Sequence, residues 1–315
     1  MPLTIASQLE EGFNTALRDL DARPTVIGVP EDRPWEAAAS ADILLARPSP
    51  AWRAARQIPR PDGWPGRLQW LHSASAGIDF YPAWMLEVPA VSCGRGVASD
   101  EIADYVIAAI YSHAKNLEAV RARSLAEWKQ APLGRVAGST VGIVGLGSIG
   151  QAVARRALAL GAEVVGARRR QLPSPVEGAR LLDSLGDVIA AADHLVLALP
   201  ATAATRNLID AALLARAKPT AHLINIARGS VLDQEALIAA LDADRLAFAT
   251  LDVTEPEPLP AEHPLWTHQR VRLTPHVSSN YTTVRHLLFE KVVASLERFV
   301  RGEAPNDLVD VQAGY

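Results

Sequence analysis

The chain has 315 residues, which predicts about two domains, and its hydrophobic content of 49% is enough to form a sizeable core. Its formal net charge of −4 at pH 7 excludes a general electrostatic attraction to nucleic acid or to an anionic membrane surface. The single cysteine, Cys93, excludes an internal disulfide framework and is typical of a reducing compartment.

The N-terminal segment lacks the features of a secretory signal peptide. Residues 1–10 have no basic region and include an acidic residue before any long apolar stretch. No uncharged run in the chain reaches the ~18 apolar residues that a membrane-spanning helix requires. We therefore expect a cytoplasmic protein without membrane or nucleic-acid partners.

Short apolar runs alternate with helical segments from the N-terminus to residue 95. Residues 10–20 have a helical pattern, and proline-rich stretches at 48–50 and 59–65 indicate loops. This alternation predicts a parallel sheet covered by helices. The predicted strands are residues 3–7, 25–29, 41–47, 67–72 and 88–92.

A second domain is predicted to follow a crossing at Gly94-Arg95-Gly96, where a helix begins at Ser99 and continues through residues 102–117. The helical stretch 283–301 is expected to return to the first domain. The fold class is therefore α/β with two Rossmann-like or flavodoxin-like parallel-sheet domains. Residues 1–95 with 283–315 are expected to form the first domain, and residues 96–282 the second. Strands of the second domain are predicted at residues 163–167, 194–199, 221–226, 246–253 and 271–274.

A glycine motif organises the second domain. An apolar β-type run comes before it and a helical stretch after it, and the motif reads Gly145-Leu146-Gly147-Ser148-Ile149-Gly150. In this setting Gly145 permits a tight turn, Gly147 lets the backbone approach a pyrophosphate, and Gly150 lets helix and strand pack closely. The N–H groups at the start of the helix would bind the phosphates. A plain glycine turn is the alternative interpretation.

Three ionisable residues follow the ends of predicted strands. Arg228, Glu257 and His276 come after the strands at 221–226, 246–253 and 271–274, respectively. In an open parallel sheet, ligands bind outside the carboxyl ends of the strands. We therefore expect these three side chains to converge.

The ordered motifs between about residue 69 and residue 282 resemble those of the D-isomer-specific 2-hydroxyacid dehydrogenase family. The resemblance implies two α/β domains with the active site in the cleft between them. Residues 1–95 with 283–315 would bind substrate, and residues 96–282 would bind a dinucleotide. Asp104 stands where that family usually has Glu. The matching segments are Ala76-Gly77-Ile78-Asp79, Ile102-Ala103-Asp104-Tyr105, Leu199-Pro200 with Thr205, Asn225-Ile226-Ala227-Arg228-Gly229, Leu251-Asp252-Val253 with Glu257-Pro258-Leu259, and Thr274-Pro275-His276.

The resemblance implies roles for the strand-end residues in reducing a 2-oxo acid. His276 would donate the proton, because imidazole titrates near neutrality. Glu257 would bind the other ring nitrogen and favour the charged imidazolium, with Glu255 as the competing candidate. Arg228 would bind the substrate carboxylate and polarise the carbonyl oxygen through its planar guanidinium.

Other residues are expected to surround the cofactor and the substrate. Asp252 would bind the nicotinamide carboxamide, with a turn or capping aspartate as the alternative, and Asn225 would orient its loop. The substrate carboxylate would also contact Ser75, Ala76 and Gly77. No metal site is predicted. The remaining cofactor-binding candidates are Leu199, Pro200, Thr205, Ile226, Ala227 and Ser278.

The choice of cofactor is predicted from the second strand of the dinucleotide domain. NAD-preferring enzymes place Asp or Glu about 20 residues after the glycine motif, where it binds the ribose 2′-hydroxyl. This chain has Arg168-Arg169-Arg170 there, and Glu163 comes too early in the strand. Guanidinium groups pair strongly with phosphate. The sequence therefore predicts a preference for NADPH, with NAD possible, and a solvated basic turn is the alternative.

We expect an NADP-preferring D-2-hydroxyacid dehydrogenase that reduces a small 2-oxo acid of the glyoxylate or hydroxypyruvate type. A formate- or phosphite-type dehydrogenase is one alternative. A dinucleotide-sensing protein of the corepressor type on the same fold is another. The resemblance also implies a homodimer that forms through residues 102–117.

Overall fold

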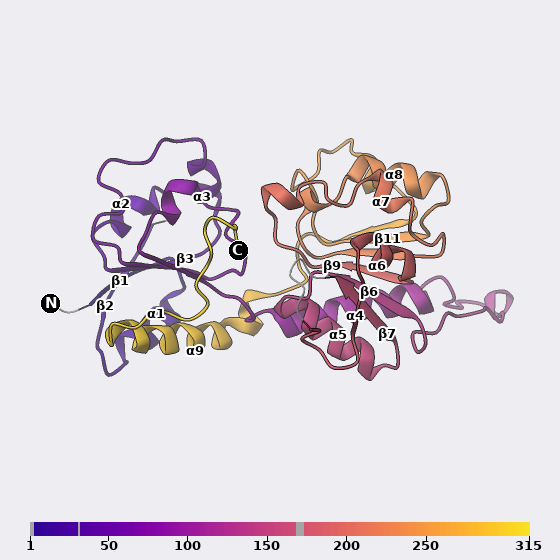
Figure 1. The fold of residues 1–315 in the computed structure, drawn as a ribbon, viewed down its shortest axis with the longest axis horizontal. Coiled ribbons are helices and arrows are strands. Elements are labelled where there is room, and N and C mark those ends of the chain that lie inside the picture. The colour runs from indigo at the N-terminus through magenta and orange to yellow at the C-terminus, as the bar shows by residue number, and fades with distance from the viewer. Residues whose placement is uncertain (1–2, 31, 168–172) are drawn as a thin grey trace. The chain divides into compact units, whose positions relative to one another are not determined.

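The computed structural model describes residues 3–30, 32–167 and 173–315. The chain divides into two compact units: unit 1 is Met1–Val97 with Tyr281–Tyr315, and unit 2 is Ala98–Asn280. Within the described residues, each unit contains a parallel sheet covered by helices (Figure 1). This confirms the predicted fold class of two parallel-sheet α/β domains. The binding roles assigned to the two domains stay a prediction.

Unit 1 is built on a five-stranded sheet. Its elements are β1 (Thr4–Ser7), α1 (Glu11–Arg18), β2 (Thr25–Gly28), α2 (Pro34–Ala38), β3 (Ile43–Ala46), α3 (Pro50–Ala55), β4 (Trp70–Ser73), a 3₁₀ helix (Ala83–Leu86), β5 (Ala90–Cys93) and α9 (Tyr281–Val300). The strand order is β2-β1-β3-β4-β5. Every residue of β3 is buried because helices cover both faces of the sheet. Figure 1 shows α1 and α9 on one face and α2 and α3 on the other.

The long C-terminal helix α9 belongs to the core of unit 1. Its apolar residues Leu288, Val292 and Leu296 recur at intervals of four, so they lie on one face of the helix. They are buried in a cluster that includes Phe13 of α1 and Trp70 of β4. The chain therefore completes the core of its first unit only after it has passed through the second.

Unit 2 is built on a seven-stranded parallel sheet with the order β12-β11-β10-β9-β6-β7-β8. Its strands are β6 (Thr140–Val144), β7 (Glu163–Ala167), β8 (Arg180–Leu181), β9 (His194–Leu197), β10 (His222–Asn225), β11 (Phe248–Leu251) and β12 (Val271–Leu273). Its helices are α4 (Ser99–Lys115), α5 (Ser148–Ala159), α6 (Leu185–Ala191), α7 (Ala211–Leu214) and α8 (Gln234–Asp242), with 3₁₀ helices at Leu125–Glu127, Ala203–Thr205, Gly229–Val231 and Pro264–Trp266.

The order of strands in unit 2 reverses between β6 and β9. The chain proceeds from β6 to β7 and β8 on one side, then returns to β9 and continues outward on the other side. Helices α4 and α5 cover one face of the sheet, while α6, α7 and α8 cover the opposite face (Figure 1). A ligand of such a sheet binds outside the carboxyl ends of the strands at the reversal. No helix within the described ranges is long and apolar enough to cross a membrane.

Three histidines lie together in unit 2, and two of them begin strands. The rings of His113 in α4 and His222 in β10 stack with centroids 4.5 Å apart, and the ring of His194 in β9 lies 5.7 Å from that of His222. Burial lowers the pKa of His194 to about 4, although Asp193 opposes the shift. Burial also holds the pKa of His222 well below its usual value, with help from the other two rings and Arg272.

We expect these buried histidines to make unfolding easier in mild acid. Below pH 6.5 the unfolded chain binds protons at His194, whereas the folded chain does so only near pH 4. The neutral histidines therefore give their full stabilisation above pH 6.5. As the pH falls from 6.5 towards about 4, the free energy of unfolding decreases by ~1.4 kcal/mol per pH unit for each such histidine. Urea unfolding of His194→Phe should show a weaker pH dependence than wild type. The exposed His286→Gln should match wild type, and an unchanged dependence in His194→Phe would contradict this explanation.

Candidate active site

The turn between β6 and α5 requires glycine at two positions. Gly145 has a φ of +105°, and a Cβ on it would lie 2.6 Å from the carbonyl oxygen of Ala198. A Cβ on Gly150 would lie 2.0 Å from the carbonyl oxygen of Gly145, because the helix passes close to the turn. Backbone conformation and close packing therefore exclude a side chain at both positions.

Gly147 differs from the other two glycines of the motif. A Cβ on it would meet no heavy atom within 4 Å among the described residues, and its φ is −73°. The fold thus gives no steric reason for glycine at this exposed position, which directly precedes α5. The first N–H groups of a helix, here starting at Ser148 and Ile149, have no intrahelical acceptor and favour an anion. These residues fit the pyrophosphate of a dinucleotide.

The loop after β9 lies beside this turn, because β9 pairs with β6. It contains Leu199 and Pro200, and Thr205 closes it: Thr205 Oγ1 donates to the Pro200 carbonyl at 2.7 Å and accepts from the Thr202 N–H at 2.8 Å. The hydroxyl of Thr205 therefore shapes the loop. The predicted contact of these residues with a cofactor stays a prediction.

Arg228 follows β10 in a loop that Asn225 organises. The side-chain amide of Asn225 donates to the carbonyl of Arg228 at 3.0 Å, and its oxygen accepts from the N–H of Ala227 at 3.1 Å. A Cβ on the next residue, Gly229, would lie 1.9 Å from the carbonyl carbon of Thr254. The loop that carries Arg228 is thus pressed against the loop that follows β11, and only glycine fits at the crossing.

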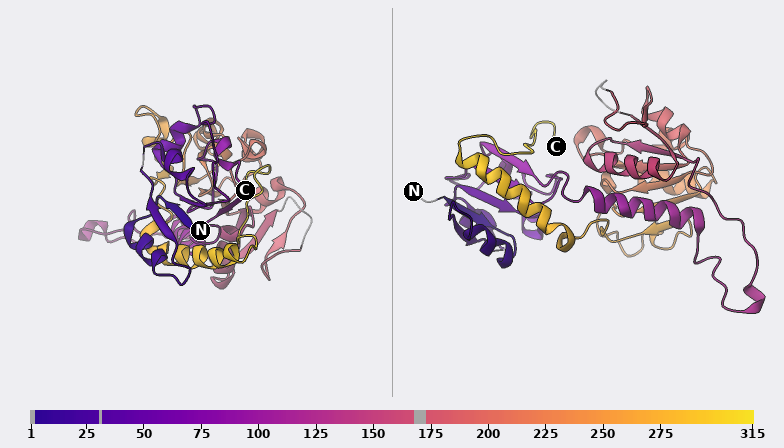
Figure 2. Two further views of the ribbon diagram at one scale, coloured as in Figure 1. Left: turned by 90° about the vertical axis from the view of Figure 1, so that its left-hand side faces the viewer. Right: turned by 90° about the horizontal axis from the view of Figure 1, so that it is seen from below.

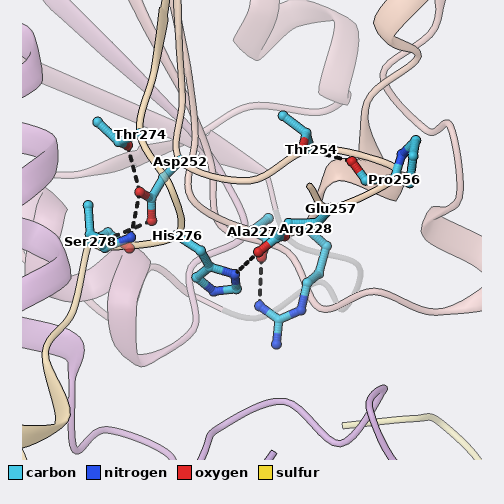
Figure 3. Close-up of polar contacts among 10 residues, drawn as sticks. Ala227, Arg228, Asp252, Thr254, Pro256, Glu257, Thr274, His276 and Ser278 are labelled. Atoms are coloured by element: carbon cyan, nitrogen blue, oxygen red, sulfur yellow. Dashed lines mark hydrogen bonds and ion pairs between the residues drawn. The ribbon is translucent and has the colours of Figure 1, made fainter. Parts of the chain in front are cut away.

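The loop after β11 carries both Glu255 and Glu257, and α8 binds the backbone of Glu255. The side chain of Gln234, at the start of α8, accepts from the N–H of Glu255 at 2.9 Å and donates to its carbonyl at 2.6 Å. The carboxylate of Glu257 lies 2.7 Å from Nδ1 of His276 (Figure 3). Of the two competing carboxylates, Glu257 is therefore the one that contacts the imidazole.

His276 is held in a left-handed backbone conformation after β12, with a φ of +54°. Its N–H donates to the carbonyl of Asp252 at 2.9 Å. Both its side chain and that of Glu257 are about one-third exposed, at 35% and 33%, so a ligand in solution can reach them. In Figure 3 the guanidinium of Arg228 and the imidazole of His276 point to the same side of the loops. The structure thus brings the three strand-end residues together.

The carboxylate of Asp252 is almost fully buried, at 1% exposure, and is bound by the loop that carries His276. Its Oδ1 accepts from Thr274 Oγ1 at 2.6 Å and from the Val277 N–H at 2.9 Å, and its Oδ2 accepts from the Ser278 N–H at 2.9 Å (Figure 3). These contacts agree with the alternative of a turn aspartate. The expected contact with a carboxamide stays a prediction.

Among the described residues, the remaining predicted ones lie after β4 in unit 1 and after β10 in unit 2. Ser75, Ala76 and Gly77 follow β4 in unit 1, where Ser75 Oγ donates to the Gly77 carbonyl at 2.7 Å. Ile226 and Ala227 are buried beside β10. The arginine run Arg168-Arg169-Arg170 lies outside the described residues. No cluster of three His, Cys, Asp or Glu side chains in the described ranges could hold a metal ion.

Two residues with contacts at this site received no role from the sequence, although Tyr105 belongs to the quoted segment Ile102-Ala103-Asp104-Tyr105. The side chain of Gln234 hydrogen-bonds the backbone of Glu255, two residues before Glu257. The hydroxyl oxygen of Tyr105 in α4 lies 2.6 Å from Thr274 Oγ1. Neither belongs to a residue type or spacing that indicates catalysis. Their contacts depend on how α8 and α4 pack, which the sequence pattern does not specify.

Comparison with known proteins gives a consistent result. Residues 107–278 match the family model described as D-isomer specific 2-hydroxyacid dehydrogenase, NAD binding domain. A glyoxylate/hydroxypyruvate reductase A of Yersinia enterocolitica is 31% identical over 232 residues, which are 72% of this chain and 73% of that relative. A glyoxylate reductase of Thermococcus gammatolerans is 42% identical over 176 residues, which are 56% of this chain and 52% of that relative.

Two solved structures are similar along the whole chain. A D-isomer specific 2-hydroxyacid dehydrogenase from Xanthobacter autotrophicus, in complex with NADPH and MES, is 29% identical and has a TM-score of 0.81. The alignment covers 100% of this chain and 99% of that protein's chain. An NADPH-dependent glyoxylate/hydroxypyruvate reductase from Sinorhizobium meliloti, in complex with NADP and sulfate, is 26% identical with the same TM-score and the same coverage.

Proposed function

The chain belongs to the D-isomer-specific 2-hydroxyacid dehydrogenase family, and we propose that it reduces a small 2-oxo acid of the glyoxylate or hydroxypyruvate type to the D-2-hydroxy acid. NADPH supplies the hydride when it is bound. The observation that carries the proposal is the 2.7 Å contact between His276 Nδ1 and Glu257 Oε1, with the guanidinium of Arg228 on the same side of the loops.

The three side chains have complementary tasks in this reaction. Because Glu257 occupies Nδ1 of His276, Nε2 is the ring nitrogen that donates a proton to the substrate carbonyl oxygen as the hydride reaches the carbonyl carbon. Arg228 binds the carboxylate in a two-point contact and polarises the carbonyl. The product is the hydroxy acid, a bound NADPH would be oxidised to NADP⁺ in supplying the hydride, and the imidazole regains its proton from solvent.

Residues of both units are assigned to binding in this proposal. The backbone N–H groups of Ala76 and Gly77, with Ser75 shaping their loop, bind the substrate carboxylate. The Gly145–Gly150 turn binds the pyrophosphate, as the open position at Gly147 supports. The remaining cofactor contacts are assigned to Leu199, Pro200, Thr205, Ile226, Ala227, Asp252 and Ser278.

The preference for NADPH is assigned to Arg168 and Arg169, with Arg170 as a further candidate. They stand where an acid would bind the 2′-hydroxyl of NAD, and no acid is present there to repel a 2′-phosphate. The similar structures with bound NADPH or NADP support this choice.

We expect Arg168→Asp to lower kcat/KM for NADPH about 10- to 100-fold, because one charge-assisted contact with the 2′-phosphate is replaced by repulsion. The measurement compares kcat/KM for NADPH and NADH at fixed substrate. Arg155→Asp makes the same charge change at an exposed position of α5 and should not alter the ratio. Wild-type preference for NADH would refute the assignment, and so would Arg168→Asp with its NADPH preference intact.

A panel of 2-oxo acids, assayed with both cofactors, tests the proposed activity. Glyoxylate or hydroxypyruvate should oxidise NADPH at a rate that depends on enzyme concentration. A protein that only senses dinucleotide would bind NADPH without turnover of any substrate. A formate- or phosphite-type dehydrogenase would instead reduce NADP⁺ or NAD⁺ when given formate or phosphite. Either outcome would refute the proposal.

A homodimer through α4 and the segment that follows it is also proposed. After α4 the chain extends away from the sheet of unit 2 (Figure 2). This segment exposes Leu125 at 93% and Trp128 at 81%, which are large fractions for apolar side chains. A second copy of the chain would cover them.

A further inference from the structure

The loop that carries His276 is fixed at four points by one buried residue. Asp252 accepts hydrogen bonds from Thr274 Oγ1 and from the N–H groups of Val277 and Ser278 through its carboxylate, and from the N–H of His276 through its carbonyl. The left-handed φ of His276 is unfavourable for a residue with a Cβ, so the surrounding contacts must maintain it. The direction of the imidazole therefore depends on this set of bonds.

Tyr105 of α4 extends the set by one further hydrogen bond. Its hydroxyl lies 2.6 Å from Thr274 Oγ1. The single proton of the Thr274 hydroxyl is donated to Asp252, because a carboxylate only accepts. Tyr105 must then be the donor, which gives a chain of bonds from Tyr105 to Thr274 to Asp252. Such chains strengthen each member because every bond polarises the next.

The Tyr105 hydroxyl can keep this role across the working pH range. Burial raises the pKa of Tyr105, and the charge of Asp252 adds to that shift. The phenol therefore stays protonated at neutral pH and continues to donate. Arg272, which lies near it on β12, has the opposite influence.

We propose that Tyr105 is a positioning residue for His276, which acts through Thr274 and Asp252 to hold the imidazole in line with Glu257. The inference rests on the proposed role of His276 as proton donor. It makes α4 part of the catalytic geometry, although no residue of that helix contacts the imidazole through a hydrogen bond in the described structure.

Tyr105→Phe removes the hydroxyl and keeps the ring, so it tests the chain of bonds without a cavity. We expect kcat with the 2-oxo acid to fall about tenfold, the effect of losing one hydrogen bond that aligns the imidazole. KM for NADPH should change much less than kcat, and the melting temperature should fall by only a few degrees. Tyr111→Phe, on an exposed tyrosine of the same helix, is the matched control and should keep wild-type kcat.

Thr274 provides a second test that does not depend on Tyr105→Phe. Thr274→Ser retains the hydroxyl and should retain far more of kcat than Thr274→Val, which breaks the chain. In the Thr274→Val background, Tyr105→Phe should cost nothing further, because the acceptor of its bond is already gone. Additive losses in the double variant would overturn the proposed chain.

A spectrum of the His276 side chain separates this inference from the proposed function. In protein labelled with ¹⁵N-histidine, the His276 resonances, identified by their loss in His276→Asn, should shift in Tyr105→Phe and not in Tyr111→Phe. This readout needs no substrate, so a wild-type protein that is inactive towards 2-oxo acids would refute the function while the spectrum still tests positioning. Wild-type His276 resonances in Tyr105→Phe would overturn the positioning role, and so would wild-type kcat in an active enzyme.

Discussion

A His276→Asn variant is expected to reduce 2-oxo acids about 10²- to 10⁴-fold more slowly than wild type, the usual contribution of a positioned acid or base. Asparagine is of similar reach and can still hydrogen-bond Glu257, which lies 2.7 Å from the imidazole. It cannot donate a proton to the substrate as an imidazolium does. The loss should therefore fall on kcat.

Steady-state kinetics and cofactor binding check this expectation together. The dissociation constant for NADPH should barely change, because the assigned cofactor contacts do not include His276. His286→Asn, at an exposed position of α9, is the matched control and should keep wild-type turnover. If His276→Asn also turns over at nearly the wild-type rate, then His276 has no part in the mechanism.

An Arg228→Lys variant is expected to lose about 100-fold in kcat/KM for the 2-oxo acid. Lysine keeps the positive charge but lacks the planar fork that contacts a carboxylate at two points, and the lost charge-assisted bonds account for a change of this size. The Asn225 contacts to the loop involve backbone atoms of Arg228 and Ala227, so they should survive the substitution.

The separation between substrate and cofactor effects is the readout for Arg228. KM for the 2-oxo acid should rise and kcat should fall, while KM for NADPH should change little. Arg180→Lys, at an exposed arginine of β8, controls for the chemical change and should behave as wild type. Normal substrate binding and turnover in Arg228→Lys would rule out the two-point contact.

Much of the architecture follows from patterns within short stretches of sequence. β7 has the bounds that its β-branched run predicts, and β9, β10, β11 and β12 lie within their predicted ranges. β4 and β5 each end one residue later than predicted, because pairing with neighbouring strands continues to Ser73 and Cys93. β8 was not predicted: its two residues, Arg180 and Leu181, are too few to produce a periodic pattern.

The convergence of the three candidate side chains was predictable from their positions along the chain. His276, Glu257 and Arg228 follow strand ends, and the parallel sheet brings strand ends together. The bond between Tyr105 and Thr274 joins residues 169 positions apart, and it depends on the packing of α4 rather than on a local pattern. For the same reason, the hydrogen bonds between Asp252 and the loop that carries His276 could not be predicted from the sequence.

Stereospecific hydride transfer tests the central claim most directly. The purified protein would be incubated with hydroxypyruvate and NADPH that carries deuterium on the transferable position of the nicotinamide, and the product would be examined for configuration and label. We expect D-glycerate with deuterium at C2. His276→Asn should form it about 10²- to 10⁴-fold more slowly than wild type. Glycerate of the L configuration, product without the label, or no product from any 2-oxo acid would contradict the proposed function.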